Sequence, residues 1–214
     1  EPLGALDRAL REDLVVEIGR ILHASESRPA VIYVTHDQAE AFALADRVAV
    51  MRAGLIEQAG APEDLVREPA NAFVADFLGL GALVSARLLE QGKAQTAWGA
   101  WSVESSAPAG SIGHVLIRVD AAALDRAELL GPRVMGRVTD HVVQPAGVRI
   151  IVQLDSPTGA ATLTVVVPIA SAPKTGEPIT LALDPSRLLF VLDPEDSQRT
   201  GSDRGPVPGS HVQA

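Results

Sequence analysis

The 214-residue sequence contains no cysteine, two lysines (Lys93 and Lys174) and only 3% aromatic residues. Without cysteine the chain has no disulfide, no thiolate zinc site and no cysteine nucleophile, which is typical of a reducing compartment such as the cytoplasm. Because aromatics are scarce but 47% of residues are hydrophobic, the core must be built from aliphatic side chains. No apolar run approaches the roughly 20 residues that a membrane-spanning helix needs.

The balance of charge is acidic. The sequence has 27 acidic and 18 basic residues, a formal net charge of −9, and almost all of its positive charge is on arginine. Such a balance argues against nonspecific binding to nucleic acid or to an anionic membrane surface, because both are polyanions that repel an acidic protein.

The first part of the chain alternates helical and strand-like patterns. Apolar residues at helical spacing predict a helix over residues 7–24, with Asp7 as its N-cap. Residues 30–35, "AVIYVT", form a short apolar and β-branched run, which predicts a strand buried on both faces of a parallel sheet. Asp37, with Glu40 three residues later, predicts a capping box that begins the next helix.

Turn residues then divide the chain into shorter elements. Residues 47–60 predict a hairpin that turns at Ala53 and Gly54, and two short helices should follow, the second closed by Gly79. Residues 1–79 therefore read as part of an α/β domain. Residues 80–194 contain many short β-rich runs separated by Gly, Pro, Ser and Asp, which predicts an all-β barrel or sandwich of the oligonucleotide-binding (OB) type. The Gly-, Pro- and Ser-rich residues 195–214 are predicted to be a disordered tail.

Two motifs in residues 1–79 resemble a known family. "EPLGALDRALRE" is similar to the end of the Walker B segment and the D-loop of ATP-binding-cassette (ABC) ATPases. "VTHDQAEAFALADRVAVMRAGLIEQAGAPEDLVREPANAFVADFLG" is similar to their switch-histidine segment. The match is specific because several elements occur in the family's order and spacing. It is nearest to the subunits that drive solute importers of the sugar, polyamine, ferric iron and sulfate types, which carry a C-terminal β domain called TOBE. Residues 80–194 fit such a domain in position and strand content.

The resemblance implies a fold and a set of site residues. The fold is the C-terminal part of a P-loop ATPase domain followed by an OB-like TOBE domain. Glu1 corresponds to the catalytic glutamate that polarises the water attacking the γ-phosphate of ATP. His36 corresponds to the switch histidine that contacts the γ-phosphate, and Asp7 to the D-loop aspartate at the dimer interface. Gly4 stands where the family usually has serine, so the D-loop loses one hydroxyl group there.

The resemblance also implies partners and a place in the cell. ATP and Mg²⁺ would be used by the full-length subunit, each pocket would be completed by a second ATP-binding subunit, and the motion would pass to transmembrane permease subunits, with a solute-binding protein acting indirectly. We expect a peripheral location at the cytoplasmic face of a bacterial membrane. The sequence has no G-x-x-x-x-G-K-[ST] phosphate loop and no L-S-G-G-Q signature loop. We therefore expect a fragment that does not hydrolyse ATP by itself.

Two other functions stay open at this stage. The chain could be a non-enzymatic TOBE-type module that binds or senses a small ligand on a vestigial ATPase platform. It could also belong to a DNA-maintenance ATPase, although its acidity, its lack of a coiled coil and its β-rich second half disfavour this.

Histidines and tryptophans elsewhere in the chain suggest no further site. The remaining histidines lack ligand spacing, so we expect no metal site among them (His23, His114, His141 and His211). Trp98 and Trp101 could form a ligand platform, but packing in the core is the favoured interpretation.

Overall fold

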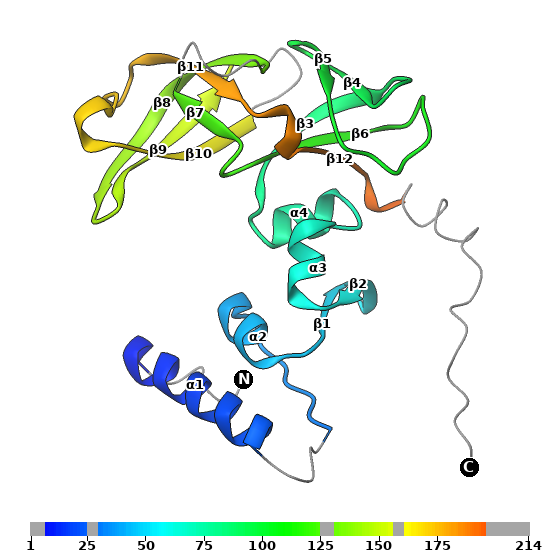
Figure 1. Cartoon of the computed structure of the whole chain (residues 1–214), viewed down its shortest axis with the longest axis vertical. Coiled ribbons are helices and arrows are strands. Elements are labelled where there is room, and N and C mark those ends of the chain that lie inside the picture. Colours follow the sequence, from blue (N-terminus) through cyan, green and yellow to red (C-terminus); the bar gives the residue numbers. More distant parts are fainter. Residues whose placement is uncertain (1–6, 25–29, 125–130, 156–160, 196–214) are drawn as a thin grey trace. The chain divides into compact units, whose positions relative to one another are not determined.

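The computed structural model describes residues 7–24, 30–124, 131–155 and 161–195. They fall into two compact units, Glu1–Pro69 and Ala70–Ala214, which are considered separately below (Figure 1). The domain boundary that the sequence suggests, at residue 79, stays a prediction, and the tail predicted from residue 195 lies almost entirely outside the described residues.

The described residues of the first unit form three helices and a hairpin. Its elements are listed in chain order: α1 (Arg8–Ala24), α2 (Gln38–Leu44), β1 (Val48–Arg52), β2 (Leu55–Gly60) and α3 (Pro62–Arg67). Strands β1 and β2 pair in antiparallel register around Ala53 and Gly54, which have φ angles of 48° and 81°. Two consecutive positive φ angles are typical of the tight turn that matches strand twist. The helices and hairpin predicted here are therefore confirmed.

The strand predicted at residues 30–35 is wrong in this structure. The segment has no regular secondary structure, and its apolar side chains are largely in solvent, with Ile32 93% and Val34 72% exposed. A strand exists only through hydrogen bonds to a neighbouring strand. Among the described residues none pairs with this segment, so its strand-forming composition is not realised.

The second unit begins with a short helix, α4 (Ala72–Phe77). The Asn71 side chain caps it by accepting a hydrogen bond from the Val74 N–H group at 3.0 Å. Gly79 ends it with a φ angle of +62°, as its position after the helix predicts. Helix α4 packs against strands β3 and β6 of the sheet that follows.

The rest of the described part of this unit is all-β, as predicted. Its strands are β3 (Gly81–Leu88), β4 (Lys93–Thr96), β5 (Gly99–Ser102), β6 (Ile112–Arg118), β7 (Ala122–Leu124), β8 (Arg133–Gln144), β9 (Gly147–Leu154), β10 (Ala161–Val167), β11 (Pro178–Leu183) and β12 (Leu188–Leu192), with short 3₁₀ turns at η1 (Ile169–Ser171) and η2 (Pro185–Arg187). They form two antiparallel sheets of five strands each, ordered β12-β6-β3-β4-β5 and β10-β9-β8-β11-β7 (Figure 1).

Each sheet curls until its outer strands approach one another. Glu104, just after β5, forms a bridge to Leu189 of β12, and β10 lies against β7. The chain crosses between the sheets twice, because β7 pairs with β11 and β12 pairs with β6. This partial closure is the barrel-like arrangement expected of an OB-type domain.

An aliphatic core holds the β unit together. Alternate residues of β3, β8 and β9 point inward, in keeping with the two-residue period of strands. Fully buried members include Ile117, Ile150, Leu163 and Leu181. Trp101 is 3% exposed and stacks on Trp98 with ring centroids 5.7 Å apart, so the packing role expected of this pair is confirmed.

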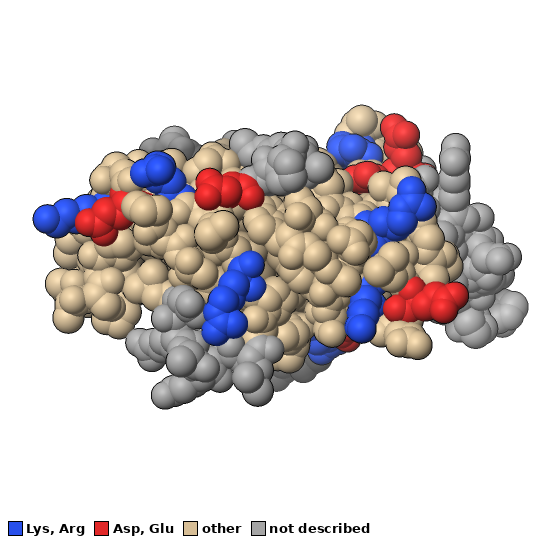
Figure 2. All heavy atoms as spheres, turned by 90° about the horizontal axis from the view of Figure 1, so that it is seen from above, with Lys and Arg blue, Asp and Glu red and all other residues tan. Residues whose placement is uncertain are grey.

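The charges on the face shown in Figure 2 are mixed. Lysine and arginine side chains lie apart from one another, with acidic side chains between them and large uncharged areas around them. In the described part of the chain, no helix is long and apolar enough to cross a membrane.

Candidate functional site

Two of the predicted site residues, Asp7 and His36, lie at the starts of two helices. Asp7 caps α1, and its Oδ1 atom accepts a hydrogen bond from the Leu10 N–H group at 3.1 Å. This satisfies one of the free N–H groups at the helix N-terminus, which is the capping role that the sequence predicts. Asp7 itself is exposed to solvent. Its D-loop role at a dimer interface stays a prediction.

His36 lies directly before α2 and is exposed to solvent. Both of its chain neighbours are fixed by hydrogen bonds. The Asp37 N–H group donates to Thr35 Oγ1 at 3.0 Å, across His36. Asp37 Oδ1 in turn accepts from the N–H groups of Ala39 and Glu40, at 2.8 and 3.3 Å, so Asp37 is the N-cap that the sequence predicts.

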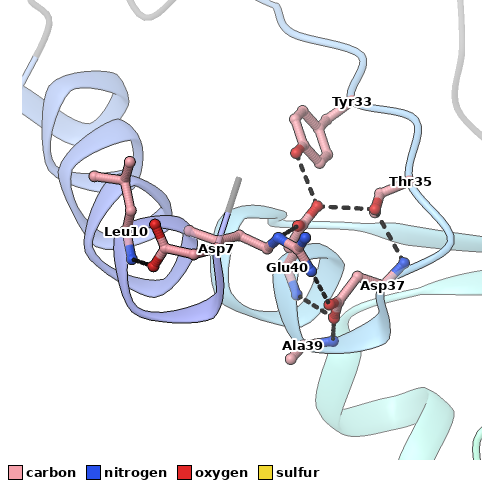
Figure 3. A network of polar contacts seen from close by, with 8 residues as sticks. Asp7, Leu10, Tyr33, Thr35, Asp37, Ala39 and Glu40 are labelled. Atoms are coloured by element: carbon pink, nitrogen blue, oxygen red, sulfur yellow. Dashed lines mark hydrogen bonds and ion pairs between the residues drawn. The ribbon is translucent and has the colours of Figure 1, made fainter. Parts of the chain in front are cut away.

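Glu40 departs from the sequence prediction. In a capping box its side chain would reach back to the N–H group of Asp37, but Thr35 accepts that hydrogen bond instead. The Glu40 Oε2 atom accepts hydrogen bonds from the hydroxyl groups of Tyr33, at 2.9 Å, and Thr35, at 2.8 Å (Figure 3). Glu40 is only 6% exposed, which makes it one of few buried charged or polar residues described.

Arg11 of α1 supplies the positive charge for this carboxylate. Its Nε atom lies 3.7 Å from Glu40 Oε1, and its Nη1 atom lies 3.9 Å from Asp37 Oδ2. A buried carboxylate requires such hydrogen bonds and a counter-charge to offset its desolvation. Helices α1 and α2 also pack against each other near Gly19 of α1. A Cβ atom at Gly19 would lie 3.7 Å from Leu44 Cδ2 of α2.

The pKa of Tyr33 is raised by burial and by the neighbouring Glu40 carboxylate. Burial, followed by the hydrogen bond to Glu40 and the negative charge of Glu40, raises the pKa of Tyr33 to about 12. All of these causes favour the neutral phenol, which keeps the proton that it donates to Glu40. Tyr33 is the single tyrosine of the chain, so its ionisation can be observed directly.

We name these side chains the Glu40 network: Arg11, Tyr33, Thr35, Asp37 and Glu40. The structure thus brings the residues that flank His36 together with α1, through Arg11, one turn after Asp7. Glu1 lies outside the described residues. The sequence predicts Glu40 only as a helix-start residue. A signal for its buried hydrogen bonds is present in the sequence, because the hydroxyl residues Tyr33 and Thr35 are spaced by two in an otherwise apolar run.

A shallow cleft lies beside the far end of α2. Its volume is ≈ 710 Å³. It is lined by Phe42, Ala45, Asp46, Ala61, Pro62, Glu63, Val66 and Arg67, from the end of α2 and from α3 and the residue before it. Within the described ranges no group of three His, Asp or Glu side chains is arranged to hold a metal ion.

Comparison with known proteins shows what this chain is similar to. No family model matches the chain. The Fe(3+) ions import ATP-binding protein FbpC of Streptomyces avermitilis is 42% identical over 192 residues, covering 89% of this chain and 53% of that protein. The sn-glycerol-3-phosphate import ATP-binding protein UgpC of Burkholderia cenocepacia is 37% identical over 216 positions, covering 94% of this chain and 56% of that protein.

Two further matches cover less or carry less weight. The spermidine/putrescine import ATP-binding protein PotA of Acetivibrio thermocellus is 46% identical over 92 residues, covering 43% of this chain and 26% of that protein. Among solved structures, the cytoplasmic molybdate-binding protein ModG with molybdate bound matches 51% of this chain and 94% of its own at 10% identity, but a TM-score of 0.42 supports no conclusion about fold or ligand.

The resemblance that the motifs suggest is therefore confirmed by relatives that match most of the chain. The chain spans about half the length of these two relatives. It is homologous to the ATP-binding subunits of ABC importers.

Proposed function

We propose that this chain forms part of the ATP-hydrolysing, nucleotide-binding subunit of an ABC solute importer. The observation that carries the proposal is the 42% identity to an importer ATP-binding protein over 192 residues. The layout around His36 supports it, because the histidine is exposed at a helix start while its two neighbours are held by hydrogen bonds.

In this proposal His36 contacts the γ-phosphate of ATP. An imidazole that donates a hydrogen bond to a phosphate oxygen stabilises the charge that develops during transfer to water. Glu1 would act as the general base, accepting a proton from the attacking water as the bond from the γ-phosphorus to the bridging oxygen breaks. The products would be ADP and inorganic phosphate.

Mg²⁺ accompanies ATP in such reactions, but the described residues offer no cluster of ligands for it. The proposal therefore assigns metal binding to none of these residues. As part of a subunit, the chain would act beside a second ATP-binding subunit, with Asp7 near their interface, and would drive transmembrane permease subunits from the cytoplasmic face of the membrane. A solute-binding protein would act only indirectly.

The proposal names the class of importer and no particular solute. Relatives of comparable identity are named for ferric ions, sn-glycerol-3-phosphate and polyamines, so identity does not separate these solutes. Solute choice in this proposal rests with the permease and the solute-binding protein.

A hybrid subunit tests the proposal. The part of the Streptomyces avermitilis protein that matches this chain is replaced by the full 214-residue chain, and phosphate release from ATP is measured with and without Mg²⁺. We expect Mg²⁺-dependent hydrolysis by the hybrid and none by the chain alone. Glu1→Gln should abolish hydrolysis while ATP binding persists.

His36→Ala is compared with a matched control, His141→Ala, in which an exposed histidine of β8 is removed. We expect hydrolysis to fall by about 100-fold in the first variant, the scale of losing one transition-state hydrogen bond. The second should hydrolyse ATP like the unchanged hybrid. A folded hybrid that binds no ATP would refute the proposal, and so would full activity in the Glu1→Gln or His36→Ala variant.

A further inference from the structure

Glu40 has no role in the reaction described so far, yet it is the buried centre of the Glu40 network. Its carboxylate is 6% exposed and accepts two side-chain hydrogen bonds, and Arg11 approaches from α1. A helix-start glutamate that served only to cap would remain near solvent and bond to the backbone. The observed contacts instead join Glu40 to three pieces of the chain, two of which, Thr35 and Tyr33, lie in the same segment before α2.

One of these pieces is the residue before His36. The Thr35 hydroxyl group donates to Glu40 at 2.8 Å and accepts from the Asp37 N–H group at 3.0 Å. It therefore acts as a bridge across the backbone of His36. With Asp37 also holding the first N–H groups of α2, rotation of the backbone at His36 would break at least one of these hydrogen bonds.

The second piece is the start of α1. Arg11 lies one turn after Asp7, and its backbone N–H group donates to the Asp7 carbonyl group at 3.0 Å. Because Arg11 Nε also lies 3.7 Å from Glu40 Oε1, the cap of α1 and the segment that carries His36 are connected through one carboxylate. The third piece is Tyr33, whose raised pKa, described above, keeps it protonated as a donor.

We propose that Glu40 is a positioning residue, which fixes the backbone of His36 through Thr35 and holds it in register with the Asp7 end of α1 through Arg11. The inference rests on the function proposed above. Glu40 does not touch ATP; it sets the direction in which His36 presents its imidazole, and so governs the rate of hydrolysis more than the affinity for ATP.

The first test uses the full chain without nucleotide. The imidazole signals of His36 are followed by nuclear magnetic resonance in Glu40→Gln and in a matched control, Glu57→Gln. Glu57 suits this purpose because its side chain is only 3% exposed and it pairs with Arg52 at 2.6 Å in the hairpin. We expect the His36 signals to shift or broaden in Glu40→Gln and to stay unchanged in Glu57→Gln. Unchanged His36 signals in a folded Glu40→Gln chain would overturn the inference.

Two further variants serve if Glu40→Gln does not fold. Thr35→Val removes the bridging hydroxyl group at nearly constant volume, and Thr35→Ser keeps it. We expect the His36 signals to move in the valine variant and to return in the serine variant. Equal behaviour of the two variants would count against the bridge.

The second test measures ATP hydrolysis by the hybrid subunit. We expect Glu40→Gln to lower kcat by about tenfold or more, as misplacement of a reacting group does, with KM for ATP changed less than about twofold. A rise in KM at constant kcat would overturn the inference. A hybrid that hydrolyses no ATP at all would refute the proposed function alone, because the resonance experiment still decides whether Glu40 positions His36.

Discussion

The ionisation of Tyr33 provides a direct test of the Glu40 network. The phenol of an unperturbed tyrosine ionises near pH 10. Burial and the neighbouring carboxylate raise the pKa of Tyr33 to about 12. Tyr33 is the single tyrosine and the two tryptophans do not titrate, so absorbance at about 295 nm reports this group alone. In the folded chain we expect a midpoint close to pH 12, and in urea one close to pH 10.

The sign of the linked change in stability follows from these two values. Since the folded-state pKa exceeds the unfolded-state pKa, the unfolded chain loses its proton first as the pH rises. The contribution of Tyr33 to stability is therefore complete below about pH 10 and is lost as the pH rises towards about 12. Urea unfolding followed across this range should show the first unit weakening.

Glu40→Gln isolates the part of the effect that comes from charge. It should lower the midpoint from about 12 without restoring it fully to about 10, because burial remains the leading cause. Glu57→Gln should leave the midpoint unchanged. A midpoint near pH 10 in the native chain, with circular dichroism showing intact helices, would refute the contacts described between Tyr33 and Glu40.

Three substitutions test the packing of each unit by chemical denaturation. Gly113→Ala would place a Cβ atom 2.4 Å from the Val191 carbonyl oxygen, so it should push β12 from β6 and destabilise the β unit by about 1–3 kcal/mol. Leu181→Ala removes a fully buried side chain from the core and should cost about 2–5 kcal/mol, with no change expected in the Tyr33 titration. Asp37→Ala removes the cap of α2 and should cost about 1 kcal/mol, seen mainly in the first unit. An effect below about 0.5 kcal/mol in any of the three would contradict the corresponding contact.

Much of the fold could be predicted because local signals determine it. Asp7 and Asp37 mark helix starts through the hydrogen bonds that their side chains accept, and Gly79 marks a helix end through its positive φ angle. In the second unit, short β-rich runs separated by turn residues predict an all-β fold. They do not predict which strands pair. The chain crosses between the two sheets from β6 to β7 and from β11 to β12. These crossings depend on pairing between strands that are distant in sequence, which no local pattern encodes.

The residues at 30–35 show the limit of such reasoning. Their composition favours a buried strand, but a strand requires neighbours, and among the described residues this segment has none. For the candidate site, the motif resemblance selects His36, and its contact with the γ-phosphate remains a proposal. The contacts of Glu40 could not be predicted, because one of them depends on the approach of Arg11 from another helix.

The central claim is that His36 contacts the γ-phosphate of ATP, and magnetic resonance with two nucleotides tests it most directly. In the hybrid subunit, the imidazole resonances of His36 are recorded with ADP and with a non-hydrolysable ATP analogue, in each case with Mg²⁺. The account predicts that the analogue shifts these resonances and that ADP does not, while His141 responds to neither. If His36 responds equally to both nucleotides, or to neither while ATP is bound, its assignment as the γ-phosphate contact is contradicted.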